Sequence, residues 1–120
     1  MMHRVAVYGT LRLEESRGGF MSGKNFRGLA KLPPNLHLFD LGAFPCVTEM
    51  PEPAPNPVVI EVYDVDDDTL SALDRIEGHP SFYERKLVPV EGHGVCWVYT
   101  LERMGAPRIK SGDWYDRDRA

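Results

Sequence analysis

Short apolar runs, many of them β-branched, recur along the chain and predict β-strands. The runs cover residues 5–8, 28–32, 36–41, 58–63, 87–90 and 95–101. The last two flank Glu91-Gly-His-Gly94, which predicts a hairpin turn. The proline pair at 33–34 predicts a break or a sheet edge, because proline cannot donate to a strand ladder. The proline-rich residues 51–57 predict an exposed loop.

One segment, residues 69–77, has a clear helical pattern. Asp66-Asp-Asp68 supplies candidates for its N-terminal cap, and Gly78 is a natural stop. Residues 12–23 could hold a further short helix. Because strands dominate without β-α-β alternation, we predict an α+β fold whose mixed or antiparallel sheet curls toward a small barrel. We expect a single domain over residues 1–120.

A carboxylate lies on the apolar face of this predicted helix. On a helical wheel of about 100° per residue, Leu70, Ala72, Leu73 and Ile76 form the core-facing stripe, and Glu77 falls between Leu73 and Leu70. Glu77 also lies in the last turn, where the helix dipole disfavours negative charge. Both effects would raise the pKa of its carboxyl, and perturbed carboxylates cluster at functional sites. A solvated helix end fits the same position, so periodicity alone leaves both interpretations open.

The end of the first predicted strand is the second candidate for chemistry. In Tyr8-Gly9-Thr10-Leu11, a glycine and a small hydroxyl residue could leave backbone N–H groups directed outward. Such groups bind anions or polarise carbonyls. The segment lacks the Gly-Lys-Ser/Thr ending of a phosphate-binding loop, and taken alone it also fits an ordinary turn.

The composition of the chain argues against a nucleic-acid-binding, membrane or secreted protein. The chain has 120 residues, 42% of them hydrophobic, and a formal net charge of −4, without the basic stripe typical of nucleic-acid binders. No apolar run approaches the roughly 18 residues of a membrane helix. The N-terminus enters a strand pattern without the apolar region of a signal peptide. We therefore expect a cytoplasmic protein that binds neither nucleic acid nor membrane.

The cysteines and histidines do not predict a metal site. Cys46 and Cys96 are fifty residues apart, which fits neither a disulfide framework nor metal-ligand spacing. Cys46 follows Pro45 and Cys96 lies in an apolar run, so both are predicted to be buried thiols. The four histidines lack the spacing of zinc ligands. A hydrolase that used either cysteine as its nucleophile would need a histidine partner, which the sequence does not identify.

Four segments of the chain match the motifs of a known protein family, in the same order along the sequence. They are Val7-Tyr-Gly-Thr-Leu11, Leu41-Gly-Ala-Phe-Pro45, Leu73-Asp-Arg-Ile-Glu-Gly-His-Pro80 with Tyr83 and Arg85, and Ser111-Gly-Asp-Trp114. Together they resemble the γ-glutamyl cyclotransferase-like superfamily, in particular its compact branch that includes γ-glutamylamine cyclotransferases. At residues 13–17 the chain reads Leu-Glu-Glu-Ser-Arg, where many relatives carry a Gly and an Asn, so the identity of the substrate's amine stays open.

This resemblance implies a small mixed β-barrel with flanking helices and a site without metal or cofactor. It implies that Glu77 is the general base and acid, and that the substrate is bound by Tyr8, Gly9, Thr10, Leu11, Phe44 and Tyr83. The implied reaction cyclises a small γ-glutamyl amide to 5-oxoproline and releases a free amine. The protein would act as a monomer or a homodimer. The alternative is a non-enzymatic module that uses the same pocket for small-molecule binding or regulation.

Overall fold

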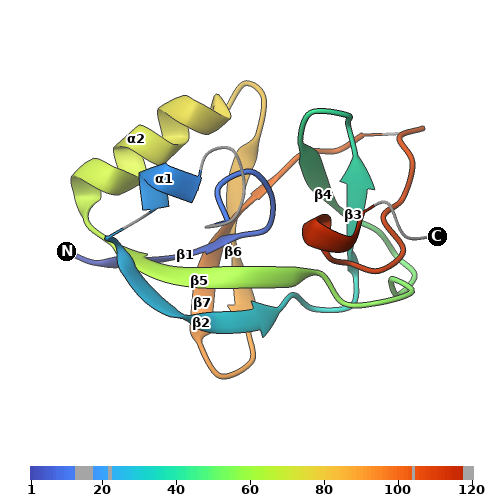
Figure 1. The fold of residues 1–120 in the computed structure, drawn as a ribbon, viewed down its shortest axis with the longest axis horizontal. Coiled ribbons are helices and arrows are strands. Elements are labelled where there is room, and N and C mark those ends of the chain that lie inside the picture. The colour runs from blue at the N-terminus through green and yellow to red at the C-terminus, as the bar shows by residue number, and fades with distance from the viewer. Residues whose placement is uncertain (13–17, 22, 104, 118–120) are drawn as a thin grey trace.

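The computed structural model describes residues 1–12, 18–21, 23–103 and 105–117, and within them strands predominate (Figure 1). The elements are β1 (His3–Val7), α1 (Gly18–Met21), β2 (Asn25–Lys31), β3 (Leu36–Asp40), β4 (Pro45–Glu49), β5 (Val59–Val65), α2 (Asp67–Glu77), β6 (Glu84–Val90), β7 (Gly94–Thr100) and a 3₁₀ turn, η1 (Trp114–Asp116).

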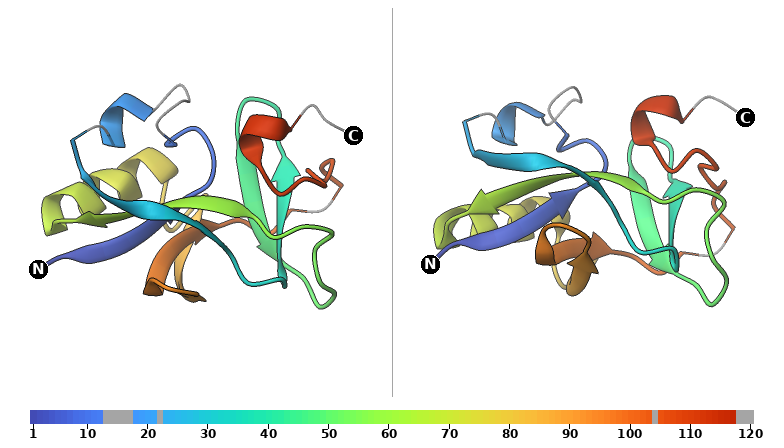
Figure 2. Two further views of the ribbon diagram at one scale, coloured as in Figure 1. Left: turned by 60° about the horizontal axis from the view of Figure 1, so that its bottom comes forward. Right: turned by 90° about the horizontal axis from the view of Figure 1, so that it is seen from below.

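Five of these strands form one mixed sheet, in the order β2-β5-β1-β7-β6. The β1–β7 pair is parallel, and the other pairs are antiparallel. The strands β3 and β4 form a separate antiparallel hairpin. The hairpin is joined to the rest by backbone hydrogen bonds from Leu101 to Val47 (3.0 Å) and from Ile109 to Leu38 (2.8 Å). The sheet therefore lies between two covering elements, α2 on one face and the hairpin on the other (Figures 1 and 2).

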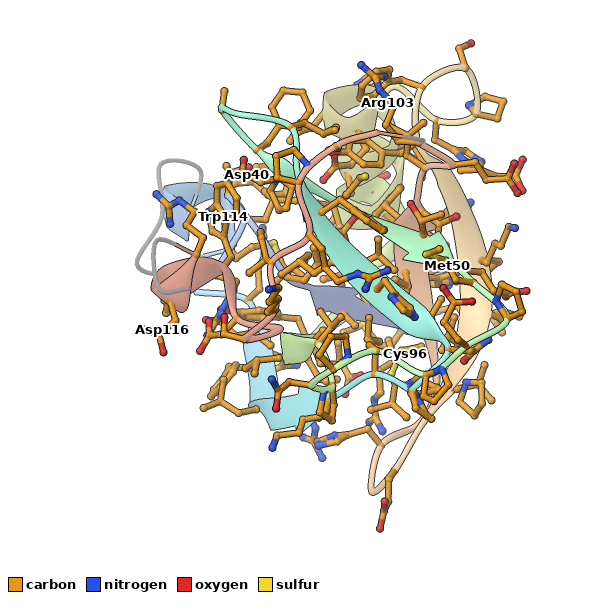
Figure 3. All side chains as sticks on the ribbon, turned by 90° about the vertical axis from the view of Figure 1, so that its right-hand side faces the viewer. Asp40, Met50, Cys96, Arg103, Trp114 and Asp116 are labelled. Atoms are coloured by element: carbon orange, nitrogen blue, oxygen red, sulfur yellow. The ribbon has the colours of Figure 1, made fainter. Side chains whose placement is uncertain are left out.

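Strand alternation sends side chains to both faces of the sheet, and both faces are apolar. Toward the hairpin, Val62 and Val98 pack with Leu38 and Val47 of the hairpin. Toward α2, the second cluster packs strand residues against the helix and includes Val5, Val7, Tyr63, Leu70 and Leu73. Figure 3 shows the side chains that fill the molecule, seen from the hairpin side. A sheet buried on both faces explains why several strands read as continuous apolar runs.

The helix α2 is capped at both ends by residues expected from the sequence. The side chain of Asp66 accepts a hydrogen bond from the backbone N–H of Thr69 (2.8 Å), which satisfies one of the free donors of the first turn. Gly78 ends the helix in the left-handed conformation, with φ of 68°. Leu70 and Leu73 are buried, whereas Glu77, on the same face but at the last residue of the helix, is half-buried.

The predicted hairpin, helix and proline-rich loop are confirmed, and three features differ from expectation. The strand β4 was not predicted, because only a short stretch around Val47 marks it. The strands β2 and β6 begin three residues earlier than expected; both are edge strands, whose exposed residues weaken the apolar pattern. Pro89 in β6 conforms to this edge position.

The predicted closure into a barrel is not confirmed. Among the described residues, β2 and β6 are the edges of the main sheet, and the hairpin forms a ladder of its own that packs on the face opposite α2. The short helix expected within residues 12–23 is present in part as α1, and residues 13–17 lie outside the described ranges. None of the described helices has the length and apolar character that crossing a membrane requires.

Candidate active site

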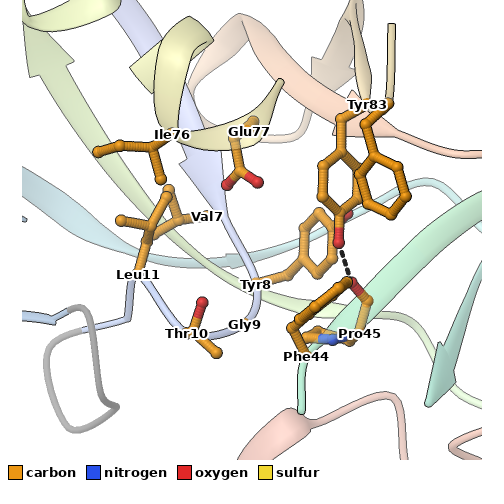
Figure 4. Close-up of a pocket in the computed structure, with 11 residues that line it drawn as sticks. Val7, Tyr8, Gly9, Thr10, Leu11, Phe44, Pro45, Ile76, Glu77 and Tyr83 are labelled. Carbon is orange, nitrogen blue, oxygen red and sulfur yellow. Dashed lines mark hydrogen bonds between the residues drawn. The ribbon is translucent and has the colours of Figure 1, made fainter. Parts of the chain in front are cut away.

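A cavity of about 160 Å³ opens between the end of β1 and the end of α2 (Figure 4). Its walls come from four places in the chain: the β1 end, the start of β4, the last turn of α2, and the segment that follows α2. The lining residues are Val7, Tyr8, Gly9, Thr10, Leu11, Phe44, Pro45, Ile76, Glu77, Phe82 and Tyr83. Every site residue predicted from the sequence is among them, although their chemical roles stay predictions.

Glu77 is the acidic residue of this lining. It is the last residue of α2, and its carboxylate points into the cavity, toward the turn that carries Thr10 (Figure 4). The apolar side chains of Val7, Leu11 and Ile76 lie on one side of it. A half-buried carboxylate that faces a cavity, with apolar side chains on one side of it, is placed to exchange a proton with a molecule bound there.

The turn that faces Glu77 is tight. The backbone N–H of Arg12 donates to the carbonyl of Gly9 (2.9 Å). Gly9 packs so closely on β4 that a Cβ atom there would lie 2.6 Å from Cγ of Pro45, which explains the need for glycine. Within the described residues, the backbone N–H groups of Thr10 and Leu11 donate no hydrogen bond to protein. Among the described residues no acceptor engages them, so they are candidate donors to a carbonyl oxygen bound in the cavity.

Two tyrosines that line the cavity form hydrogen bonds between their hydroxyl groups and the backbone of neighbouring strands. The Tyr8 hydroxyl donates to the carbonyl of Tyr99 (2.6 Å) and accepts from the N–H of Val47 (3.2 Å), which joins β1, β7 and β4. Its burial, with smaller contributions from Tyr83 and Glu77, raises its pKa well above the ordinary value. The Tyr83 hydroxyl donates to the carbonyl of Pro45 (2.6 Å). Both rings thus line the cavity while their hydroxyls fix its walls.

The outer wall is aromatic. Phe44 makes edge contacts with Phe82 and Tyr83, at ring-centroid distances of 6.1 and 6.4 Å. Phe82 is 42% exposed and was not predicted as a site residue. Its position next to Tyr83 in the sequence could have identified it as a residue of the site. Pro45, Ile76 and Val7 were also missed, although each is a sequence neighbour of a predicted residue.

A polar cluster supports the helix one turn before Glu77. Asp74 accepts hydrogen bonds from Arg85 (2.8 Å) and from the hydroxyl of Tyr99 (2.7 Å), and the guanidinium of Arg85 lies over the ring of Trp97. Burial of Asp74 would raise its pKa, but the hydrogen bonds from Arg85 and Tyr99 outweigh this effect and the pKa is lowered. These hydrogen bonds join α2 to β6 and β7, and so hold the last turn of the helix, which carries Glu77, in place against the sheet.

Both cysteines are buried, as predicted (Cys96 is labelled in Figure 3). Burial raises the pKa of each thiol, which lowers its reactivity as a nucleophile. Within residues 1–12, 18–21, 23–103 and 105–117, no three His, Cys, Asp or Glu side chains converge on a point where a metal ion could be held.

Comparison with known proteins gives a consistent result. Residues 5–116 match the family described as "Gamma-glutamyl cyclotransferase, AIG2-like". A protein of Vibrio cholerae is 36% identical over 98% of this chain and 99% of its own length. The Escherichia coli K12 "Gamma-glutamylcyclotransferase family protein YtfP" is 33% identical over 97% and 99%. The crystal structure of an uncharacterised Pyrococcus horikoshii protein superposes with a TM-score of 0.80, at 27% identity, over 98% of this chain and 92% of that one. The chain therefore belongs to the γ-glutamyl cyclotransferase, AIG2-like family.

Proposed function

We propose that this protein cyclises a γ-glutamyl amide to 5-oxoproline and a free amine, with Glu77 as general base and then general acid. The observation that carries the proposal is the opposition of two groups across one cavity. The carboxylate of Glu77 faces the turn whose Thr10 and Leu11 N–H groups are directed to no acceptor among the described residues. Membership of the family supports the same reaction class.

The proposed reaction is an intramolecular aminolysis. The α-amine of the substrate attacks its own γ-carbonyl carbon, a five-membered ring closes, and the bond from this carbon to the leaving nitrogen breaks. The α-amine is an ammonium near neutral pH. It loses one proton to solvent before attack. Glu77 accepts the second proton, which the attacking nitrogen releases as the ring closes, and gives it to the departing nitrogen, which leaves as a neutral amine. Proton transfer of this kind contributes typically about 10²–10⁴-fold to the rate.

The negative charge that develops on the γ-carbonyl oxygen must be stabilised by hydrogen-bond donors. The N–H groups of the turn at Gly9–Leu11 supply them from a rigid position, which is worth on the order of 3 kcal/mol per donor. The confined cavity also favours the folded conformation of the glutamyl chain that ring closure requires. The apolar and aromatic residues of the outer wall contact the remainder of the substrate.

The experiment that tests the role of Glu77 replaces it by glutamine. Glutamine preserves the shape of the side chain but cannot accept the amine proton, so Glu77→Gln lowers the rate of 5-oxoproline release by about 10²–10⁴-fold. The matched control is Glu91→Gln, which makes the same chemical change on the exposed turn between β6 and β7. The control keeps wild-type turnover.

The outcome separates the enzyme from the binding module. Circular dichroism and thermal melting check that both variants are folded. Wild-type turnover by Glu77→Gln would contradict the assignment of the base. A wild-type protein that binds γ-glutamyl amides, yet releases no product from a panel that varies the amine, would favour the non-enzymatic alternative.

A further inference from the structure

A buried cation directly follows the turn that faces Glu77. The side chain of Arg12 is about 4% exposed, and its guanidinium is enclosed on three sides. Its Nε donates to Glu61 (3.1 Å), one terminal nitrogen donates to Asp113 (2.7 Å), and its Cζ lies 3.6 Å from the ring centre of Tyr115. Burial opposes this charge, but the hydrogen bonds to Asp113 and Glu61 outweigh it and raise the pKa of Arg12.

The two carboxylates come from distant parts of the chain. Glu61 lies on β5, paired in register with Val7 of the cavity wall. Its oxygens also accept hydrogen bonds from the hydroxyls of Tyr63 (2.9 Å) and Tyr115 (3.2 Å). A buried arginine is stable only where partners and hydrogen bonds compensate for its lost hydration. The position of Arg12, and with it the end of the turn, is therefore determined by these partners.

The second carboxylate belongs to the C-terminal segment. Asp113 caps the 3₁₀ turn η1 by accepting from the N–H of Tyr115 (3.0 Å), with the same oxygen that accepts from Arg12. The segment is held in place by a hydrogen bond from the N–H of Val59 to the carbonyl of Gly112 (2.8 Å) and by Trp114, which is 1% exposed. The C-terminal segment, about a hundred residues away in sequence, thus contacts Arg12 at the end of the turn through the side chain of Asp113.

We propose that Arg12 is a positioning residue that locks the Gly9–Leu11 turn, and that the C-terminal segment 111–116 supports the active site through Asp113. Arginine suits this role because its planar fork reaches two carboxylates at once while its face stacks on an aromatic ring, which lysine cannot reproduce. The catalytic part of the inference rests on the proposed function, whereas the coupling between segment and turn does not.

A second arginine pair provides a control at the opposite end of the same two strands. Arg4 of β1 donates to Asp64 of β5 (2.8 Å), so this pair also joins β1 to β5. It is more exposed, with side chains 31% and 19% accessible, and neither residue lines the cavity. Loss of this pair disturbs the sheet without reaching the turn.

The experiment compares Asp113→Ser with Asp64→Ser. Serine at 113 keeps an oxygen for the cap of η1, but it has neither the charge nor the reach for Arg12. The first readout is hydrogen exchange of the Arg12 backbone amide, which donates to Gly9, relative to the Leu70 amide in the first turn of α2. We expect Asp113→Ser to raise this ratio by at least about tenfold, because the turn opens locally, and Asp64→Ser to leave it unchanged.

The second readout is turnover per folded molecule with a γ-glutamyl amide. In Asp113→Ser we expect kcat to fall by about ten- to 10²-fold, with a smaller change in KM, because displaced donors affect the transition state most. Asp64→Ser keeps the wild-type kcat. Arg12→Lys, with Arg4→Lys as its control, gives the same pattern and serves if Asp113→Ser does not fold.

The results separate this inference from the proposed function. An unchanged exchange ratio in both Asp113→Ser and Arg12→Lys, or an equal rise in Asp64→Ser, would overturn the coupling. A raised ratio with unaltered kcat would overturn the positioning role. If the wild-type protein releases no 5-oxoproline, the proposed function fails, whereas the exchange ratios still decide whether Arg12 locks the turn.

Discussion

The two faces of the main sheet carry different kinds of packing. The face toward the β3–β4 hairpin is filled by aliphatic residues such as Ile60, Val62 and Val98. The face toward α2 is also apolar at its centre, but it borders the cavity and two polar clusters, one around Asp74 and one around Arg12. Apart from Tyr8, whose ring lines the cavity, the hairpin face therefore contributes mainly to stability, whereas the helix face combines stability with the geometry of the site.

This difference predicts that stability and turnover can be changed separately. Hydrophobic burial has no direction, so the hairpin face tolerates small shifts of its side chains. Hydrogen bonds do have a direction, so a shift on the helix face moves the turn or the carboxylate out of line. Substitutions of similar size on the two faces should therefore have unequal effects on catalysis.

The largest expected effect on stability comes from truncating one leucine on each face. Leu38 of the hairpin and Leu73 of α2 are 2% and 0% exposed. Each Leu→Ala change should lower the free energy of unfolding by about 2–5 kcal/mol, measured by urea denaturation. Per folded molecule, Leu38→Ala should keep wild-type turnover. Leu73→Ala should reduce it, because Leu73 lies one helical turn before Glu77. Equal losses of turnover would break the distinction between the faces.

The strands of the main sheet that are buried on both faces were the easier part of the fold to predict from the sequence. These strands show apolar runs such as residues 58–63, which burial on both faces produces. The strand β4 was not predicted because its own apolar pattern is short. Its pairing with β3 and its burial are determined by tertiary packing. Closure into a barrel could not be judged from local patterns, since it depends on which strand edges pair.

A smaller effect is expected from Gly9→Ala on the helix face. The added Cβ would lie 2.6 Å from Cγ of Pro45, so the turn or β4 must move. Such overpacking costs typically about 1–3 kcal/mol of stability, and displacement of the turn should lower kcat. The double variant Gly9→Ala/Pro45→Ala removes the clash and should recover part of both losses in a double-mutant cycle. Additive losses would show that the contact with Pro45 does not set the turn.

Seven of the eleven residues that line the cavity were named from the sequence, but the cluster that supports the turn was not. Periodicity placed Glu77 on the helix face, and the order of motifs supplied the turn and Tyr83. The cluster of Arg12, Glu61 and Asp113 was not predicted, because its members are widely spaced in sequence. Arg12 and Glu61 look like ordinary charged residues there, and Asp113 belonged to a recognised segment to which no role was assigned. Only the fold brings them together, and a buried charge leaves no local signal until its partners are known.

The smallest effect concerns the pH dependence of stability through Asp74. Its lowered pKa means that the carboxylate stabilises the fold above the ordinary pKa of about 3.9, and that this contribution is lost as pH falls through the lower native value. Asp74→Asn should therefore cost about 1 kcal/mol near pH 7, and the difference from wild type should shrink below about pH 4. Urea denaturation from pH 3 to pH 7 would measure it, with Glu91→Gln as a control that stays within about 0.5 kcal/mol. A difference that does not change with pH would contradict the charged hydrogen bonds to Arg85 and Tyr99.

The identity of the product tests the central claim most directly. Wild-type protein is incubated with a γ-glutamyl amide and, separately, with its N-acetyl form, and the products are identified by mass spectrometry. Acetylation delocalises the lone pair of the α-nitrogen into a carbonyl, so this nitrogen can no longer close the ring at a useful rate. Ring closure by the α-nitrogen predicts 5-oxoproline from the free amine and no release from the acetylated compound. Free glutamate from the first compound, or rapid cleavage of the second, would contradict ring closure and would assign Glu77 to the activation of water.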